Sequence, residues 1–130
     1  MSRVLLALAL AAAPLPAIAA PLTVRTGETW LFRIDKGEPA QAHKTNPAAK
    51  PARGQVKVAV RSLFGTMMTI SNNSDQGYSF KAELIDSDGK AVAARACGLP
   101  AKNQPALESW PQKAAAVRIG SFKPASGGVC

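Results

Sequence analysis

The stretch Asp86-Ser-Asp-Gly89 is the part of the sequence that looks most like a metal-binding loop. An EF-hand loop needs a third oxygen ligand at its fifth position and a bidentate Glu at its twelfth position. Counted from Asp86, those positions hold Lys90 and Cys97, and neither supplies a carboxylate. Gly89 instead suits the position of a hairpin turn that requires a positive φ. The sequence therefore predicts a turn here and no metal site.

The other residues that could do chemistry are few and scattered. His43 is the only histidine, so a zinc site with two histidines is excluded by count. A Ser-His-Asp or Cys-His arrangement would have to use this residue, which we expect to be solvated in a loop. The eight acidic residues fall mostly at expected turns, and their spacing marks no carboxylate pair for glycoside hydrolysis. We therefore predict no catalytic residues, no metal and no cofactor. A small hydrolase whose carboxylates come together only on folding is the alternative.

Residues 1–19 have the order of a secretory signal peptide. One positive charge, Arg3, precedes an apolar run, and Ala17 and Ala19 form an A-x-A cleavage motif. The run is about half of the ~20 residues that a membrane-spanning helix needs; an uncleaved N-terminal anchor is the alternative. We place cleavage after Ala19, because Pro21 would disfavour a cut one bond later. No later segment is apolar enough to span a membrane, so we expect a periplasmic or secreted bacterial protein.

Both cysteines, Cys97 and Cys130, would lie on the exported side of the membrane. An even count in an oxidising compartment predicts one disulfide bond. This bridge would restrict the unfolded chain and hold a tail that would otherwise fray. Two free thiols, or an intermolecular bridge through Cys130, are the alternatives.

The chain carries a formal charge of +8 at pH 7, which becomes +7 when Arg3 leaves with the signal peptide. A basic exported protein can contact anionic lipid head groups, cell-wall polymers or nucleic acid. Cations are densest in residues 36–61, and within this stretch we expect Lys44, Lys50 and Arg53 to contact an anionic surface. The stretch lacks the interleaved aromatic residues of single-strand nucleic-acid binders, so no specific nucleic acid is expected. A solvated surface that only aids solubility is the alternative.

Alternation of apolar and polar residues predicts several short strands. In residues 55–61, Val56, Val58 and Val60 share one face, as in a strand with one buried side. The other expected strands are residues 29–35, 66–72, 78–86, 91–97, 106–110 and 114–122. Residues 112–117 could instead form a helix, because Ala and Lys favour one.

Residues 36–54 differ in composition from the segments on both sides. They are rich in Pro, Ala and Lys and contain no large apolar side chain, so they make a poor core segment. Pro-rich polar stretches tend to be extended and mobile. We expect a flexible loop here, within a single domain that spans residues 20–130.

Six or seven short strands separated by turns predict an all-β fold, a small antiparallel β-sandwich with one disulfide. The pattern Thr69-Ile-Ser-Asn-Asn-Ser74, then Tyr78-Ser-Phe-Lys-Ala-Glu-Leu84, then Asp88-Gly89, resembles the immunoglobulin-like domains of exported bacterial proteins. The resemblance implies an immunoglobulin-like sandwich without a catalytic motif. The two cysteines lie late and do not bracket a central Trp, so a disulfide here would clip the C-terminal part and not join the two sheets.

These observations favour a non-catalytic exported binding or accessory module of the bacterial envelope, of unknown specificity. Its exposed edge strands could pair with a strand of an envelope protein. Its basic loop could contact an anionic polymer or a lipid surface. An inhibitor or ligand binder that uses the basic loop is a further alternative, because a fold alone does not decide function.

Overall fold

The structure is a computed structural model that describes residues 19–126. This part of the chain contains nine β-strands and no helix. The strands are β1 (Leu22–Arg25), β2 (Thr29–Asp35), β3 (Glu38–Thr45), β4 (Val56–Arg61), β5 (Thr66–Asn72), β6 (Tyr78–Ile85), β7 (Ala91–Ala94), β8 (Pro105–Trp110) and β9 (Ala116–Pro124). Within residues 19–126, no helix is long and apolar enough to cross a membrane. Cys130 and all but the last residue of the predicted signal peptide lie outside the described residues.

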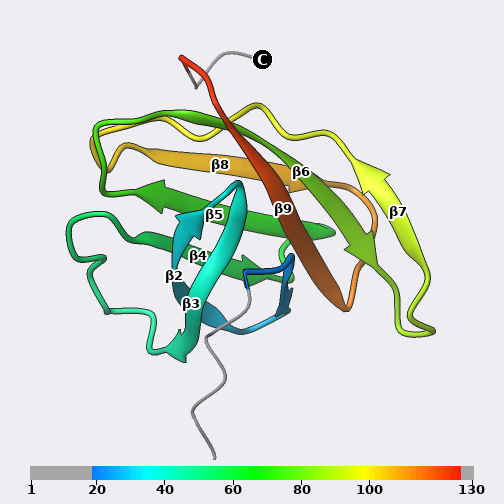
Figure 1. Cartoon of the computed structure of the whole chain (residues 1–130). Coiled ribbons are helices and arrows are strands. Elements are labelled where there is room, and N and C mark those ends of the chain that lie inside the picture. Colours follow the sequence, from blue (N-terminus) through cyan, green and yellow to red (C-terminus); the bar gives the residue numbers. More distant parts are fainter. Residues whose placement is uncertain (1–18, 127–130) are drawn as a thin grey trace, which may run out of the picture.

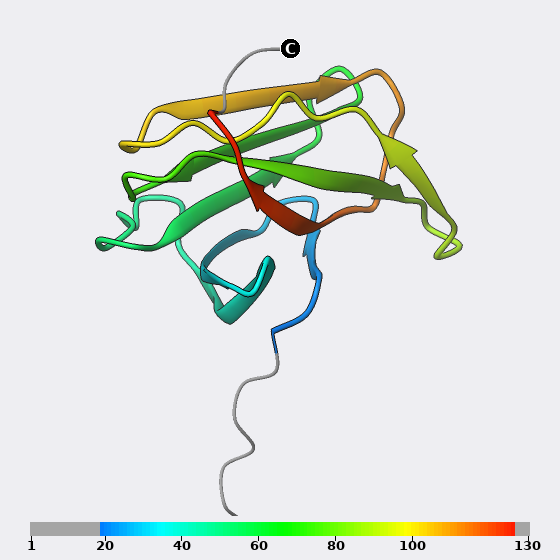
Figure 2. The same ribbon diagram turned by 45° about the horizontal axis from the view of Figure 1, so that its top comes forward.

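The strands form two antiparallel sheets that lie one over the other (Figure 1). The first sheet has the order β1-β9-β6-β7, and the second has the order β3-β2-β4-β5-β8. In the turned view of Figure 2, β9 (red) lies between β1 (blue) and β6 (green), as the pairing requires. The expected all-β fold with antiparallel sheets is therefore confirmed, with nine strands in the described part in place of six or seven.

The hydrophobic core lies between the sheets and is built from alternate residues of each strand. Val56, Val58 and Val60 of β4 are at most 1% exposed, and so are Met68 and Ile70 of β5. The register places Val58 opposite Ile70 and Val60 opposite Met68, so these side chains form one continuous inner layer. Burying a side chain of this size contributes about 1.5–3 kcal/mol. The alternating valines of β4 thus correctly predict which face of the β4–β5 hairpin is buried in the core.

The aromatic residues strengthen the same core. Trp110 is 7% exposed and belongs to the core cluster, and the partly buried Trp30 packs against that cluster. Phe122 of β9 stacks on Phe80 of β6 with ring centroids 5.4 Å apart. It also lies 5.8 Å from Phe32 of β2, so aromatic packing joins the two sheets.

The structure corrects the loop expected at residues 36–54. Lys36 and Gly37 form a two-residue turn with φ values of 50° and 82°, as in a type I′ hairpin. β3 then pairs with β2 from Glu38 to Thr45. Apolar and polar residues do not alternate regularly in β3, because it is an edge strand. Its backbone pairing with β2, and not the burial of its side chains, defines the strand. Only residues 46–55 remain a loop.

The loop at residues 46–55 is tied to its surroundings by hydrogen bonds. Lys57 Nζ donates to the carbonyl oxygen of Pro47, and Asn73 Nδ2 donates to that of Pro51 over 2.9 Å. The N–H of Gly54 donates to the carbonyl oxygen of Asn73 over 2.6 Å. These contacts hold the loop between β4 and the segment that follows β5.

The structure also settles the two remaining local alternatives. Residues 112–115 form the turn before β9, and the strand starts at Ala116, so the helix alternative at residues 112–117 is wrong. Asp86 and Gly89 form a turn in which the Gly89 N–H donates to the Asp86 carbonyl oxygen over 3.0 Å. Gly89 has a φ of 83°, which confirms the expected hairpin turn.

Candidate functional site

The three cations expected to contact an anionic surface do not lie together. Lys44 stands opposite Trp30 in the β2–β3 register, near the start of β2. Arg53 lies near the other end of β2, where its carbonyl oxygen accepts a hydrogen bond from Arg33 Nη1 over 3.1 Å. Lys50 is exposed in the same loop as Arg53. The structure therefore groups Lys50 with Arg53 and separates Lys44 from them.

Lys44 is committed to an ion pair with Glu28. Its Nζ lies 2.8 Å from Glu28 Oε2. This hydrogen bond, supported by the Arg25 N–H and Trp30 Nε1, lowers the pKa of Glu28 from 4.5 to about 2, against the opposing effect of burial. Because the charge of Lys44 is already matched by a carboxylate, Lys44 is a poor candidate for binding an external anion.

Four chain segments that are distant in the sequence meet at the end of the sandwich that carries Arg53. They are residues 46–55, 73–77, 98–104 and 123–126. Backbone hydrogen bonds join them: Gly54 N–H to Asn73 O (2.6 Å), Lys102 N–H to Ser74 O (2.7 Å) and Ala125 N–H to Gly77 O (3.0 Å). We call this group of four segments the cationic end.

The cationic end carries an excess of positive charge. Lys50, Arg53, Lys102 and Lys123 are all exposed, and Asp75 is the only acidic residue of the four segments. Sequence reasoning missed Lys102 and Lys123, because they lie far along the chain from the basic stretch at residues 36–61. Only the long-range pairing of the loops brings them near Lys50 and Arg53. A cluster of cations opposed by a single acid is suited to hold phosphate or carboxylate groups.

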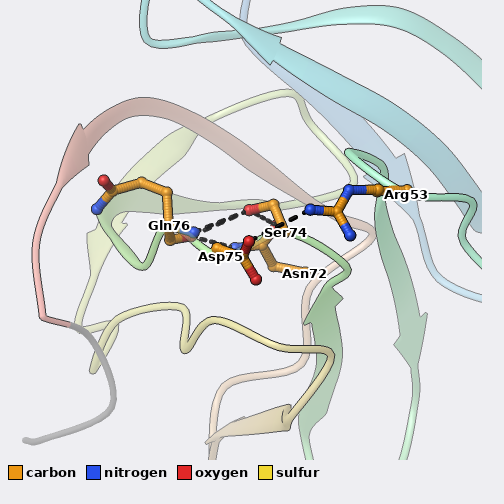
Figure 3. Close-up of polar contacts among 5 residues, drawn as sticks. All are labelled: Arg53, Asn72, Ser74, Asp75 and Gln76. Atoms are coloured by element: carbon orange, nitrogen blue, oxygen red, sulfur yellow. Dashed lines mark hydrogen bonds and ion pairs between the residues drawn. The ribbon is translucent and has the colours of Figure 1, made fainter.

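A network of polar side chains fixes the part of the cationic end that follows β5 (Figure 3). Asn72 is 1% exposed and donates through Nδ2 to the Gln76 carbonyl oxygen over 2.6 Å. Ser74 Oγ donates to Asn72 Oδ1 over 2.9 Å and accepts from the Gln76 N–H over 3.3 Å. These bonds set the loop backbone and hold Asp75 at its tip, facing the guanidinium group of Arg53.

The ion pair between Arg53 and Asp75 is weak. The atoms Nη2 and Oδ2 are 3.3 Å apart, and the two side chains are 87% and 77% exposed. An exposed pair of this kind contributes about 0–1 kcal/mol. Arg53 can therefore exchange Asp75 for another anion at little cost, in contrast to Lys44.

Residues 19–126 show no cluster of side chains arranged as a catalytic site. A groove of about 700 Å³ lies over β6, β7 and β9, and Glu83 is the only acid among its described lining residues. Glu83 Oε1 is bound to Arg118 Nη2 over 3.0 Å, so this groove offers no pair of carboxylates. His43 is exposed, with Nδ1 3.3 Å from the Gln41 carbonyl oxygen. Within the described part of the chain, no group of three or more His, Cys, Asp or Glu side chains could hold a metal ion.

Comparison of the chain with known proteins gives no match to a protein family, to a curated protein or to a solved structure. The function must therefore be argued from the residues of the chain itself.

Proposed function

We propose that this protein is an exported, non-catalytic binding module of the bacterial envelope, and that its cationic end binds an anionic polymer or lipid head groups. The fold would be an immunoglobulin-like sandwich, with the loops at one end carrying the binding residues. The observation that carries the proposal is the gathering of four exposed cations against one acid, from four separate segments.

The chemistry of these side chains favours a repeating anion over a small buried ligand. Lys50, Lys102 and Lys123 are exposed and present flexible, strongly hydrated ammonium groups. Such groups attract phosphate or carboxylate charges over a distance of about one Debye length, roughly 8 Å at physiological ionic strength. Many weak contacts of this kind give binding that depends strongly on salt and little on the detailed shape of the ligand.

Export would also allow a disulfide between Cys97 and Cys130. Cys97 is half-buried in the segment after β7, and its backbone N–H donates to Glu108 Oε1 over 2.6 Å. Glu108 is itself 6% exposed. The backbone at Cys97 is thus held against β8, which would give the C-terminal tail a fixed point of attachment. The intact mass of protein purified from its native compartment, with and without reduction, tests the bridge: two thiols in the unreduced protein would exclude it.

The binding proposal is tested with a triple variant and a matched control. Lys50→Gln, Arg53→Gln and Lys102→Gln remove three cations from the cationic end. Removing about 1 kcal/mol of attraction for each cation predicts a loss of roughly 100-fold in affinity for vesicles rich in phosphatidylglycerol. Binding of the unchanged protein should fall as ionic strength rises.

The control removes the same charge elsewhere. Lys81, Lys90 and Lys113 are exposed on β6 and on turns outside the cationic end. Changing all three to Gln should reduce affinity far less than the triple variant of the cationic end. Equal losses in the two triple variants would mean that only net charge matters, and no binding at low ionic strength would end the proposal. A soluble anionic polysaccharide without lipid, used in place of the vesicles, distinguishes a polymer from a lipid surface.

A further inference from the structure

Glu38, the first residue of β3, holds a carboxylate oxygen that lacks a donor. Its Oε1 accepts the backbone N–H of Ser121 over 3.0 Å. Its Oε2 is buried and has no hydrogen-bond partner among the residues that the structure describes. Leaving a charged oxygen buried without a donor is costly, and most buried polar atoms in folded proteins are paired. A donor for this oxygen is therefore expected.

The segment just before β1 lies beside this oxygen. A Cβ atom placed on Gly120 would lie 2.7 Å from Glu38 Oε2 and 3.3 Å from Cβ of Pro21. The carboxylate and the Pro21 ring therefore border the same small space above Gly120. The backbone N–H of Ala20 donates to the carbonyl oxygen of Pro39, the residue after Glu38, over 3.1 Å. Ala20 is thus docked at the first residues of β3.

The charged side chains nearest in the register do not supply the missing donor. Asp35 stands opposite Glu38 in β2, and as an acid it cannot pair with the carboxylate. Lys36 is exposed in the β2–β3 turn. Lys81 stands opposite Gly120 in β6 and is exposed. The N–H of Ala20 is also not free to donate, because a peptide nitrogen carries one hydrogen and Pro39 already accepts it.

We infer that Glu38 is the binding site for the α-ammonium group that forms at Ala20 when the Ala19–Ala20 peptide bond is cleaved. Water adds across the bond, leaving a carboxylate on Ala19 and an amine on Ala20 that takes up a proton. The resulting ammonium group has three N–H donors in place of one. One can stay on Pro39, and a second can reach Glu38 Oε2, with opposite charges facing each other.

This inference rests on the proposed export, because signal-peptide cleavage is what would create the new terminus. It goes further in giving cleavage a structural role in the mature fold. The uncleaved chain would carry an unsatisfied carboxylate at the start of β3, and the cleaved chain would satisfy it. The mature protein should therefore be more stable than the same chain with a blocked or extended N-terminus.

The first experiment determines the terminus and then its protonation. N-terminal sequencing of protein purified from its native compartment should give Ala20 as the first residue. The amine is left unmodified, and the ¹³C NMR shifts of Ala20 in isotopically labelled protein are followed against pH. In the unchanged protein the pKa of the Ala20 amine should lie about one unit or more above the usual value near 8. In Glu38→Gln it should return to that value.

Glu83→Gln is the matched control, because it removes a carboxylate of β6 that pairs with Arg118. It should leave the pKa of the Ala20 amine raised. An unshifted amine in the unchanged protein, or the same loss of shift in both variants, would overturn the inference. Such a result would leave the anion-binding proposal intact, since that proposal is read from vesicle binding. A first residue other than Ala20 would overturn the cleavage position and this inference together.

A second measurement covers the case in which Glu38→Gln folds poorly. Acetylation of the α-amine removes its charge and leaves Glu38 in place. It should lower the melting temperature of the unchanged protein by several degrees and have little effect on Glu38→Gln. Equal effects of acetylation on both proteins would contradict the pairing.

Discussion

The ion pair between Glu28 and Lys44 makes the stability of the protein depend on pH in a way that one substitution should remove. Glu28 lies in the turn between β1 and β2. Its Oε1 accepts the Arg25 N–H over 3.0 Å and Trp30 Nε1 over 3.2 Å, and its Oε2 pairs with Lys44 over 2.8 Å. The change Glu28→Gln keeps the size of the side chain and removes its charge.

The size of the effect follows from the lowered pKa of Glu28. A shift from 4.5 to about 2 corresponds to roughly 3 kcal/mol at 1.36 kcal/mol per unit, which is a ceiling. The side chain of Glu28 is 19% exposed, but that of Lys44 is 60% exposed. Solvent screening of the exposed partner reduces the expected contribution to about 1–2 kcal/mol.

The direction in which stability changes with pH follows from the linkage between proton binding and folding. The pKa of Glu28 is lower in the folded state than in the unfolded state, so the unfolded chain takes up a proton first as pH falls. The stabilisation is therefore fully present above pH 4.5 and is lost as pH falls toward about 2. Glu28→Gln should lack this part of the acid sensitivity.

Urea unfolding, followed by tryptophan fluorescence at neutral pH and in acid, measures the effect. The unchanged protein should be more stable than Glu28→Gln by about 1–2 kcal/mol at neutral pH, and the difference should shrink to a few tenths near pH 2. Glu83→Gln, which breaks the more exposed pair with Arg118, should cost less than about 1 kcal/mol. A difference between Glu28→Gln and the unchanged protein that stays constant with pH would refute the reasoning.

Four further substitutions test the core packing and the β4–β5 turn by chemical denaturation. Met68 is fully buried, so Met68→Ala should lower the free energy of unfolding by about 2–5 kcal/mol. Met67 lies on the other face of β5, so Met67→Ala should lower it by less than about 1 kcal/mol. Equal losses would contradict the assigned faces. Phe64 is 95% exposed with a φ of 50°, so Phe64→Gly should stabilise the protein by about 0.5–1 kcal/mol, and a loss would show that its ring has a role in the fold. Gly65→Ala should cost at least about 2 kcal/mol, because its Cβ would clash with the Trp110 carbonyl oxygen and φ is 110°; a neutral result would mean that the turn can shift.

The strands that bury alternate residues could be predicted from the sequence. The valines of β4 and the alternation in β5 and β6 indicate the inner face of each strand, because a shift of one residue would turn every apolar side chain toward solvent. The turn at Asp86 could also be predicted, because Gly89 suits a backbone position with a positive φ. β3 could not be predicted in this way, because only two of its eight side chains are buried and no apolar pattern marks it.

The residues of the cationic end were predictable only in part. Lys50 and Arg53 were found from local charge density, and Lys44 was included on the same ground, although a partner from the β1–β2 turn neutralises it. Lys102 and Lys123 join the cationic end through loop contacts that no local pattern encodes. Glu38 looked like one acid in a basic stretch, because burial of a single oxygen depends on Gly120 and Pro21, which lie elsewhere in the chain.

Because the cationic end is built from four separate segments, the binding proposed for it would require the folded protein. A peptide cut from any one segment would carry at most two positive charges and none of the arrangement. The unfolded chain would bind an anionic partner less well than the folded one, so saturating ligand should raise the melting temperature as its concentration rises above the dissociation constant. Under the proposed function, an anionic surface would therefore also stabilise the folded form of the protein.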